Sequence, residues 1–224
     1  MKSDRDLTLA RLLQLASPAL PVGAYSYSQG LESAVDSGIV HDAASAERWI
    51  AELLDFSVAR MEGPVLLRLH AAWSTGSEAD AARWNRLILA SRESAELRAE
   101  SVQMGYSLSR LLAELGEGGG LAGWEEVSFT AAYAYAASSW GVGADDALVA
   151  YLWTWAENQV MAAVKAVPLG QSAAQKMLLA LGEAITAAAV RARSLDDEGL
   201  GNYAPGLALL SARHETQYSR LFRS

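Results

Sequence analysis

The sequence has no cysteine and only three histidines among its 224 residues. Without cysteine the chain can form neither disulfide bonds nor thiolate metal sites, and this composition fits a reducing compartment. None of His41, His70 and His214 has a second histidine three or four residues away, the spacing that places two ligands on one helix face. A transition-metal site built by this chain alone would need scattered ligands. We therefore expect the protein to have no metal or other cofactor of its own.

Basic residues are also scarce, because 18 Lys and Arg stand against 26 Asp and Glu, which gives a net charge of −8. Nucleic-acid binding needs clustered Lys and Arg, so we expect no nucleic-acid partner. The first six residues lack the apolar run of a secretory signal. The longest uncharged run, residues 127–144, contains Ser, Thr, Tyr and Gly and is too polar for a membrane span. These features predict a soluble, cytoplasmic protein that does not enter a membrane.

Strand-like alternation and repeats of fixed period are absent too. Apolar residues recur instead at helical spacing, as in the first helix, where they are Leu9, Leu12, Leu13 and Ala16. The sequence predicts an all-α fold, a compact bundle of roughly eight to ten helices that forms a single domain over residues 1–224. Five glycines lie within residues 116–123 and predict a flexible loop inside that domain.

A long helix is expected over residues 93–115, with its leucines toward the core. The side chains opposite those leucines are charged: Glu93, Glu96, Arg98 and Glu100. We expect this charged face to be solvated.

The segment 17–32 (SPALPVGAYSYSQGLE) is an unusual loop near the start of a helical chain. Its prolines and glycines exclude a continuous helix. It nevertheless contains Leu20, Val22, Tyr25 and Tyr27, which a solvated linker has no reason to contain. We expect this opening loop to be packed or bound. A capping box from Ser26 and Gln29 is expected to start the helix that follows.

The same segment is also similar to an enzyme motif. The residues from Ser26 to Gly30 differ by one position from a nucleophile elbow centred on Ser28. An elbow needs a preceding strand, which a Pro-rich loop in an all-α chain does not supply. Serine hydrolysis by Ser28 is therefore the alternative hypothesis, and helix capping by these serines is preferred. The sequence has no Gly-x-x-x-x-Gly-Lys-Ser/Thr motif, so the chain is not itself a P-loop GTPase.

The last twelve residues are locally basic on an acidic protein. Three arginines alternate there with apolar and aromatic side chains: Arg213, Arg220, Arg223, Tyr218, Leu221 and Phe222. Arg and aromatic residues are enriched at protein–protein hot spots. Because this tail follows a Gly-rich segment, we expect it to order only on binding a partner.

The opening loop and the tail together resemble the signatures of the urease accessory protein F (UreF) family, which usually has Phe where this chain has Tyr25. The similarity covers most of the chain and includes residues 157–178. The resemblance implies a non-catalytic, all-α accessory protein of urease maturation that forms a homodimer. Such a protein binds the accessory protein D (also called H), recruits the nickel-carrying GTPase UreG, and helps deliver nickel to apo-urease in a GTP-dependent way. Nickel and GTP are then handled by the complex.

From the motifs and this resemblance we expect partner binding by residues of the opening loop, of the tail and of one lysine between them. These are Tyr25, Tyr27, Gln29, Glu32, Lys165, Arg213, His214, Glu215, Gln217, Tyr218, Arg220, Leu221, Phe222 and Arg223.

Overall fold

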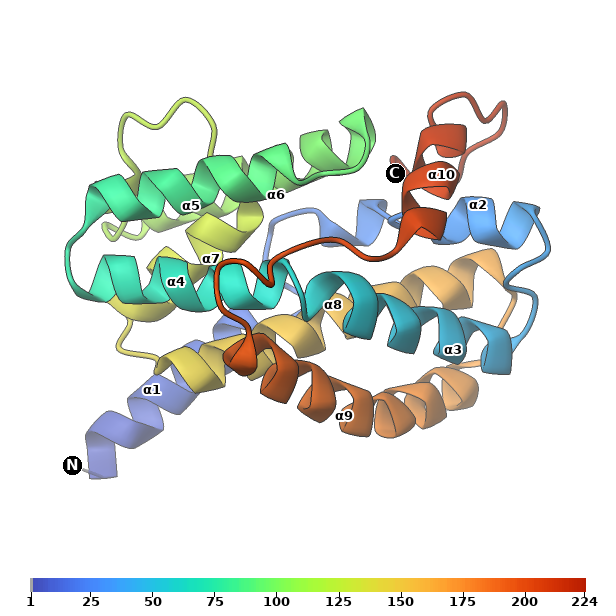
Figure 1. The fold of residues 1–224 in the computed structure, drawn as a ribbon. Coiled ribbons are helices and arrows are strands. Elements are labelled where there is room, and N and C mark those ends of the chain that lie inside the picture. The colour runs from blue at the N-terminus through green and yellow to red at the C-terminus, as the bar shows by residue number, and fades with distance from the viewer. Residues whose placement is uncertain (1) are drawn as a thin grey trace.

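The structure is a computed structural model that describes residues 2–224. Over this range it contains ten α-helices and no strand, which confirms the all-α prediction (Figure 1). The α-helices are α1 (Lys2–Leu15), α2 (Leu31–Asp36), α3 (Ala43–Leu53), α4 (Glu62–Ser74), α5 (Glu78–Ala90), α6 (Ala95–Glu114), α7 (Phe129–Ser139), α8 (Ala144–Ala166), α9 (Gln171–Ser194) and α10 (Pro205–His214). Short 3-10 turns lie at η1 (Ala24–Ser26) and η3 (Gly119–Leu121), and a π-helical turn at η2 (Leu54–Val58) follows α3.

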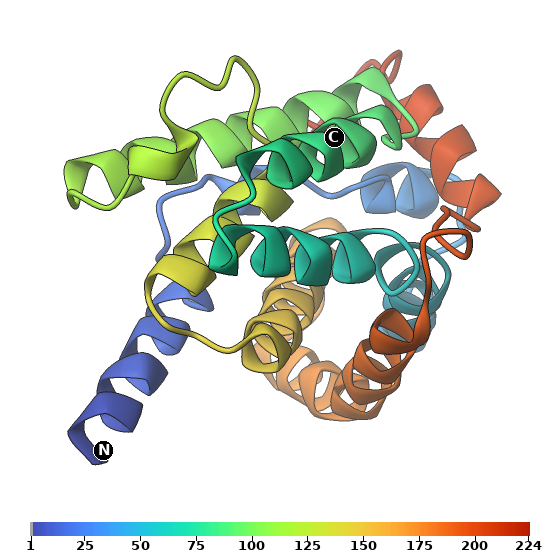
Figure 2. The ribbon, with the colours of Figure 1, turned by 60° about the vertical axis from the view of Figure 1, so that its left-hand side comes forward.

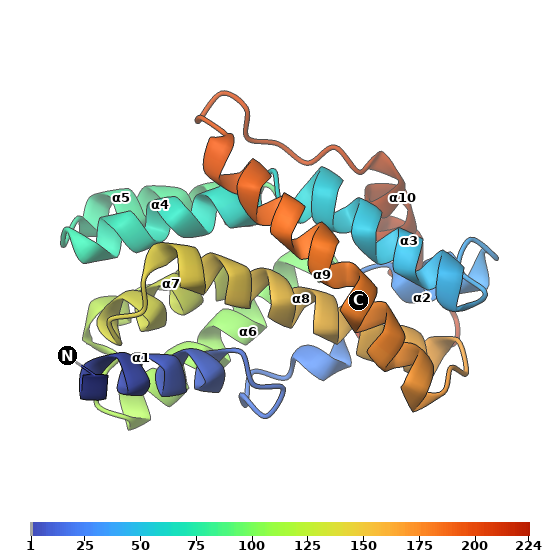
Figure 3. The ribbon, with the colours of Figure 1, turned by 90° about the horizontal axis from the view of Figure 1, so that it is seen from below.

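The core is organised around α7 and α8. Helix α7 lies between α4 and α6, and α8 packs along α9 and also touches α3 and α4 (Figures 1 and 3). Small residues make the close packing of α7 possible, because Ala131, Ala132, Ala134, Ala136 and Ala137 are all fully buried. Residues 127–144, the longest uncharged run, thus form a buried helix and its flanking turns.

The glycine-rich loop between α6 and α7 contains the short turn η3 and lies at the edge of the bundle, where Figure 2 draws it in yellow-green. The Tyr135 hydroxyl accepts a hydrogen bond from the Gly120 amide at 3.0 Å and donates one to the Glu117 carbonyl at 2.8 Å. Leu121 is buried beneath the loop. These contacts hold part of the loop in place, and its flexibility stays a prediction.

Helix α1 differs from the sequence expectation. It lies at the edge of the molecule with its N-terminal end pointing away from the bundle (Figures 1 and 2). Leu15 is buried, but Leu9 and Leu13 of the predicted apolar stripe are more than half exposed. Helix α1 packs mainly against α7 and α8; Leu12 is partly buried against the core, whereas Leu9 and Leu13 stay exposed. The helix forms as predicted, and half of its apolar stripe, Leu9 and Leu13, faces solvent.

Within residues 2–224 a single helix, α9, is long and apolar enough to cross a membrane. One side of this helix packs against α8 and α3. A core helix of a bundle passes the same test of length and composition, so this finding is weak support for a membrane span.

Candidate partner-binding site

The opening loop is shaped by residues with left-handed backbone. Gly23 and Gly30 have φ of 76° and 79°, values that glycine adopts without the steric cost that a Cβ brings. Gly30 also lets α10 approach, because a Cβ there would lie 3.0 Å from a Leu207 methyl group. Between the two glycines the chain buries Tyr27 and leaves Tyr25 68% exposed. The loop is thus partly core and partly surface.

The capping box predicted for α2 is not formed. Gly30 is the N-cap residue and makes no side-chain cap. The Ser28 hydroxyl, rather than that of Ser26, accepts from the amide of Glu32 at 3.3 Å. The Gln29 side chain is unavailable for capping because its amide group bonds to Glu100 and Trp155 instead.

Ser28 itself is fully buried. Its hydroxyl donates to the Ser224 carbonyl at 2.5 Å, and its amide donates to the same oxygen at 2.9 Å. A nucleophile must be reachable by its substrate, and this hydroxyl is committed to holding the tail. The geometry supports a structural role for Ser28.

The tail lies against the opening loop, so the two ends of the chain form one site. The Arg223 amide donates to the Ser26 carbonyl at 2.8 Å, and the Phe222 side chain is buried. The Lys165 ammonium lies 5.7 Å from the ring centroids of both Tyr25 and Phe222, within cation–π range. We expected the tail to order only on binding. In the structure of the single chain it is already packed, because Phe222 and the backbone of the last residues have partners within the fold.

A polar cluster joins α2, α6 and α10 beneath the tail. His214 is fully buried, and its Nδ1 and Nε2 atoms lie 2.6 Å from Glu96 and 3.2 Å from Glu32, respectively. Glu32 also accepts from the amides of Leu221 and Phe222, at 2.6 and 2.9 Å. These polar side chains have hydrogen-bond partners inside the protein, and they fix the path of the tail.

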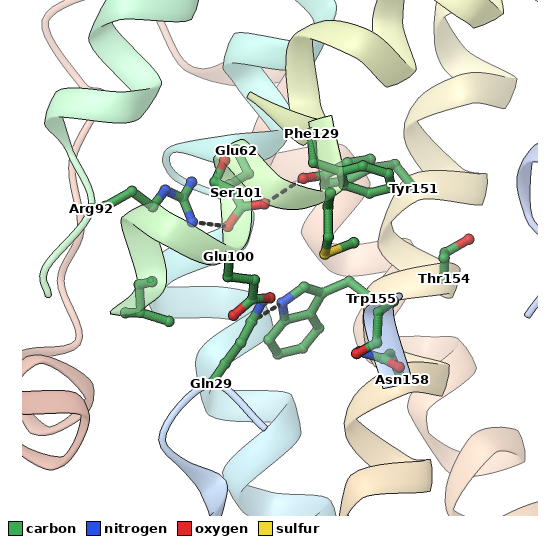
Figure 4. A pocket seen from close by; sticks show the side chains of 13 residues that line it. Gln29, Glu62, Arg92, Glu100, Ser101, Phe129, Tyr151, Thr154, Trp155 and Asn158 are labelled. Atoms are coloured by element: carbon green, nitrogen blue, oxygen red, sulfur yellow. Dashed lines mark hydrogen bonds and ion pairs between the residues drawn. The ribbon is translucent and has the colours of Figure 1, made fainter. Parts of the chain in front are cut away.

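A pocket lies next to this cluster, between the opening loop and helices α4, α6 and α8 (Figure 4). Gln29 reaches into it and donates to Glu100 at 2.6 Å, while its carbonyl oxygen accepts from the Trp155 indole at 2.7 Å. Glu100 also accepts from the Ser224 hydroxyl at 2.7 Å. The pocket volume of about 40 Å³ has room for roughly three water molecules. Burial raises the pKa of the Glu100 carboxyl to about 7.

The far wall of the pocket contains a buried ion pair. Arg92 donates to Glu62 at 2.8 Å, and the Tyr151 hydroxyl donates to the other Glu62 oxygen at 2.5 Å. Burial, followed by the neighbouring Glu62 charge, raises the pKa of Tyr151. Both carboxylate oxygens of Glu62 therefore have donors, as a buried charge requires.

The sequence analysis missed Glu62, Arg92, Glu100 and Trp155 as members of this site. Glu100 was assigned to the solvated face of its helix, and that was wrong, because the opening loop and the tail cover it. Helical periodicity places a residue on a face, and only the packing of distant segments decides what covers the face. Glu100 and Arg98 are two positions apart, and Arg98 does lie at the surface, paired with Glu126.

The fourteen residues predicted to bind partners divide into two groups. The structure uses one group for internal contacts: Tyr27, Gln29, Glu32, His214, Glu215, Gln217 and Phe222. The other group is exposed and forms a mixed basic and aromatic surface: Tyr25, Lys165, Arg213, Tyr218, Arg220, Leu221 and Arg223. The structure thus brings both ends of the chain together and uses half of these side chains for internal contacts, although Glu215 is also exposed.

No group of three or more His, Asp and Glu residues within the described part of the chain could hold a metal ion. His70 bonds to the Val142 carbonyl at 2.8 Å and lies 3.3 Å from the Ser74 hydroxyl. His41 lies at the surface beside Asp42. The absence of a cofactor of its own stays a prediction.

Comparison with known protein families gives one match, to the UreF family model, over residues 40–182. The chain belongs to the UreF family. Relatives named urease accessory protein UreF include those of Azoarcus sp. (strain BH72), Dechloromonas aromatica (strain RCB) and Janthinobacterium sp. (strain Marseille), which are 58%, 52% and 50% identical. These alignments cover 97%, 97% and 96% of this chain and 96%, 98% and 98% of the relatives.

The UreF match begins just before α3 and ends within α9, so the opening loop and the tail lie outside it. The relatives extend the similarity over nearly the whole chain. The site combines the opening loop and the tail, which flank the matched region, with residues of α4, α6 and α8 inside it.

Proposed function

We propose that the protein acts in urease maturation as an adaptor without catalytic activity. In this role it bridges the accessory protein D (or H) and the GTPase UreG, modulates GTP hydrolysis and supports nickel delivery to apo-urease in the cytoplasm. Membership of the UreF family supports the role in urease maturation. The support for the bridging role is the surface of this chain.

The observation that carries the proposal is the joint surface of the opening loop and the tail. Tyr218 and Leu221 project from it and are 105% and 62% exposed. Arg223 lies beside them at the surface, and the Arg220 side chain is partly exposed although it pairs with Glu96. Exposed aromatic and apolar side chains bordered by arginines form the composition of a protein–protein hot spot.

The internal contacts give this surface a fixed shape. Glu32 holds the amides of Leu221 and Phe222, and Ser28 holds the carbonyl of Ser224. A partner that binds such a preformed surface does not have to order the tail, which lowers the entropic cost of association. Rigid presentation fits an adaptor that must hold two proteins in one geometry.

A second apolar surface supports assembly with more than one chain. Leu7, Leu9 and Leu13 of α1 are each at least half exposed. Exposed apolar residues grouped on one helix are typical of association sites. We propose that α1 contributes to assembly, including the homodimer, while the loop and tail bind another component.

The test is co-purification of the full chain with its cognate D and G proteins in the presence of Ni²⁺ and GTP. The double variant Tyr218→Ala/Leu221→Ala should weaken capture of at least one of the two by about ten- to a thousand-fold, the range for loss of hot-spot residues. The matched control is Tyr106→Ala/Leu115→Ala, which removes a Tyr and a Leu that are about half exposed on and after α6. Undiminished capture by the loop-and-tail variant would contradict the proposed surface.

The regulatory part of the proposal has its own readout. GTP hydrolysis by the G protein is measured alone, with the D protein, and with both the D protein and this chain. A change that appears only when this chain is present, and that disappears with the Tyr218/Leu221 variant, supports modulation of the GTPase. An unchanged rate in the assembled complex would limit the role to scaffolding.

A further inference from the structure

A second basic and aromatic surface surrounds Arg60, which lies between the π-helical turn η2 and helix α4. The guanidinium carbon of Arg60 lies 5.6 Å from the ring centroid of Phe56 and 5.3 Å from that of Tyr203. Both distances are within cation–π range. The Phe56 and Tyr203 side chains are 43% and 54% exposed. We call these three side chains the Arg60 surface.

The backbone of η2 explains how another segment can bind there. The Arg60 amide donates to the Ser57 carbonyl, so it does not take the Phe56 carbonyl as it would in an α-helix. The Arg60 carbonyl also lacks its usual helical donor, because the residue four positions later is Pro64, which has no N–H. Two carbonyls of this turn are therefore left for hydrogen bonds with another part of the chain.

The segment between α9 and α10 binds both carbonyls. The Gly201 amide donates to the Arg60 carbonyl at 3.2 Å, and the Tyr203 amide donates to the Phe56 carbonyl at 2.9 Å. Asn202, between them, is anchored by hydrogen bonds of its own side chain. Figure 1 shows this segment crossing the junction of α3 and α4. The two rings beside Arg60 are thus held in place by backbone contacts of the fold.

The guanidinium of Arg60 is positioned, but its charge has no carboxylate beside it. Its Nε atom donates to the Asp55 carbonyl at 3.0 Å, whereas the Asp55 carboxylate pairs with Arg191 at 2.6 Å. Among residues 2–224, Arg60 forms no ion pair, and neither of its Nη groups has a hydrogen-bond acceptor. The Nη groups are therefore available to an acceptor from outside the chain.

Other arginines that lie over an aromatic ring in this protein are paired with an acid. Arg68 and Arg83 both lie over Trp84, at 5.3 and 4.7 Å from its ring centroid, and both pair with Asp197. Arg60 has the rings without the acid. A planar guanidinium with two open Nη groups matches the two oxygens of a carboxylate.

The charge of the chain favours one kind of anion. At a net charge of −8 the protein repels polyanions such as nucleic acids and anionic membranes, which bind clustered basic residues. A single carboxylate presented by a protein needs only one guanidinium. The exposed rings of Phe56 and Tyr203 add apolar area beside it, and an arginine with aromatic neighbours is typical of a protein–protein hot spot.

We propose that the Arg60 surface binds an Asp or Glu side chain of another protein in the urease-maturation complex, while an apolar neighbour of that acid packs on Phe56 and Tyr203. The surface shares no residue with the loop-and-tail surface or with α1, so it is a further docking site of the adaptor. A guanidinium already held between two rings loses little side-chain freedom on binding. The assignment to this complex rests on the proposed function.

The first experiment identifies the bound acid by cross-linking. The full chain with Arg60→Lys is mixed with the cognate D and G proteins and treated with a carbodiimide, which joins an amine to a carboxylate in contact with it. The other lysines are few, so mass spectrometry can assign a link to position 60: Lys2, Lys165 and Lys176. Arg48→Lys is the matched control, because Arg48 is an exposed arginine on α3.

Position 60 should link to an Asp or Glu of the D or G protein, and position 48 should not. Absence of this link, or a link only to carboxylates of this chain in the same or a second copy, would overturn the proposal.

The second experiment measures the affinity for the linked protein. Arg60→Gln should weaken binding by about tenfold or more, as for loss of a hot-spot arginine, and added salt should narrow the difference. Arg48→Gln should bind like the unmodified chain. The melting temperature of each variant is measured alongside, and if Arg60→Gln is destabilised, the cross-link formed by the folded Arg60→Lys chain decides.

The two proposals can fail separately. Full affinity of Arg60→Gln, together with lost affinity of Tyr218→Ala/Leu221→Ala, would overturn the Arg60 surface and leave the adaptor function standing. The reverse result would remove the loop-and-tail surface and keep the Arg60 surface. An unmodified chain that binds neither the D nor the G protein would overturn both.

Discussion

Glu100 shows how segments far apart in sequence change the environment of one side chain. It lies on α6, and its carboxylate oxygens accept from Gln29 of the opening loop and Ser224 of the tail. Burial disfavours the charged form, and it raises the pKa of this carboxyl from its ordinary 4.5 to about 7. The folded protein therefore binds a proton here that the unfolded chain releases.

Because the pKa of Glu100 differs between the folded and the unfolded chain, the free energy of unfolding must depend on pH. A raised acid pKa contributes stability that is fully present below the unfolded value of 4.5 and is lost as pH rises toward 7. Between pH 5 and 8 the loss from this group should be about 2 kcal/mol. The Glu100→Gln variant should avoid most of that loss. Its free energy of unfolding, relative to that of the unmodified chain, should therefore rise with pH. Urea unfolding at both pH values measures the difference, and equal pH dependence of the two proteins would contradict it.

Ser28 gives a second prediction at this scale. Ser28→Ala removes the hydroxyl that donates to the Ser224 carbonyl and accepts from the Glu32 amide. Unfolding free energy should fall by about 1 kcal/mol, because the Ser28 amide still donates to the same carbonyl. Hydrolysis of a generic ester should be the same for both proteins. A hydrolysis rate that is present in the unmodified chain and absent from the variant would revive the hydrolase hypothesis.

Residue types and spacing predicted the members of the site better than their roles. The opening loop and the tail were both singled out from the sequence, and both are in the site. Glu32 and His214 were expected to face a partner, yet they bond to each other and to the tail. A sequence shows that a polar side chain is present, but the group that bonds to it lies about 180 positions away in this case.

At the scale of elements, α1 shows that helical periodicity predicts a helix but not whether its apolar face is buried. Its leucines have helical spacing, and the helix forms as expected. Whether such a stripe is core depends on a neighbour, and α1 has neighbours along only part of its length. An apolar face without a neighbour in its own chain is available to another chain.

Charge placed on this face should therefore affect assembly more than folding. Leu9→Glu/Leu13→Glu should lower the dimer fraction, or the capture of another accessory protein, while the melting temperature changes little. Leu15→Ala on the same helix is the contrasting change, because Leu15 is fully buried and its truncation should cost about 2–5 kcal/mol. Light scattering and thermal unfolding together measure both effects. Unchanged assembly in the double variant would remove α1 from the interface.

The loop and the tail show the same dependence on context. Neither has a regular pattern, and each supplies hydrogen-bond partners that the other needs, as between Ser26 and Arg223. The tail was expected to be unstructured alone because its composition offers little local support. It is packed because Phe222 and Ser224 enter spaces that the loop and α6 provide.

At the scale of the whole molecule, residue composition and motifs predict that the isolated chain lacks tight nickel binding and GTP hydrolysis. It has no cysteine, and residues 2–224 contain no cluster of ligands for a metal. The P-loop motif is absent from the sequence. In the proposed adaptor role, the partners would handle both nickel and GTP.

The isolated chain should therefore neither bind Ni²⁺ with sub-micromolar affinity nor hydrolyse GTP. Calorimetric titration with Ni²⁺ and a phosphate-release assay test the two statements separately. The unmodified chain is compared with His41→Gln, which removes the exposed histidine most able to bind Ni²⁺ weakly. Tight binding that survives in this variant and in a monomeric form would contradict the prediction.

The sequence by itself determined the helices, because helical spacing and the residues that end helices act over only a few positions. It also determined the family, because the motifs of the opening loop and the tail can be recognised without knowledge of the fold. The tertiary structure alone decided which charges are buried, which leucines face solvent, and that the two ends of the chain meet. These outcomes depend on contacts between segments far apart in sequence, such as Gln29 with Glu100 or Ser28 with Ser224. Such contacts are stable because distant segments exclude water from them, and this exclusion cannot be predicted from a local sequence pattern.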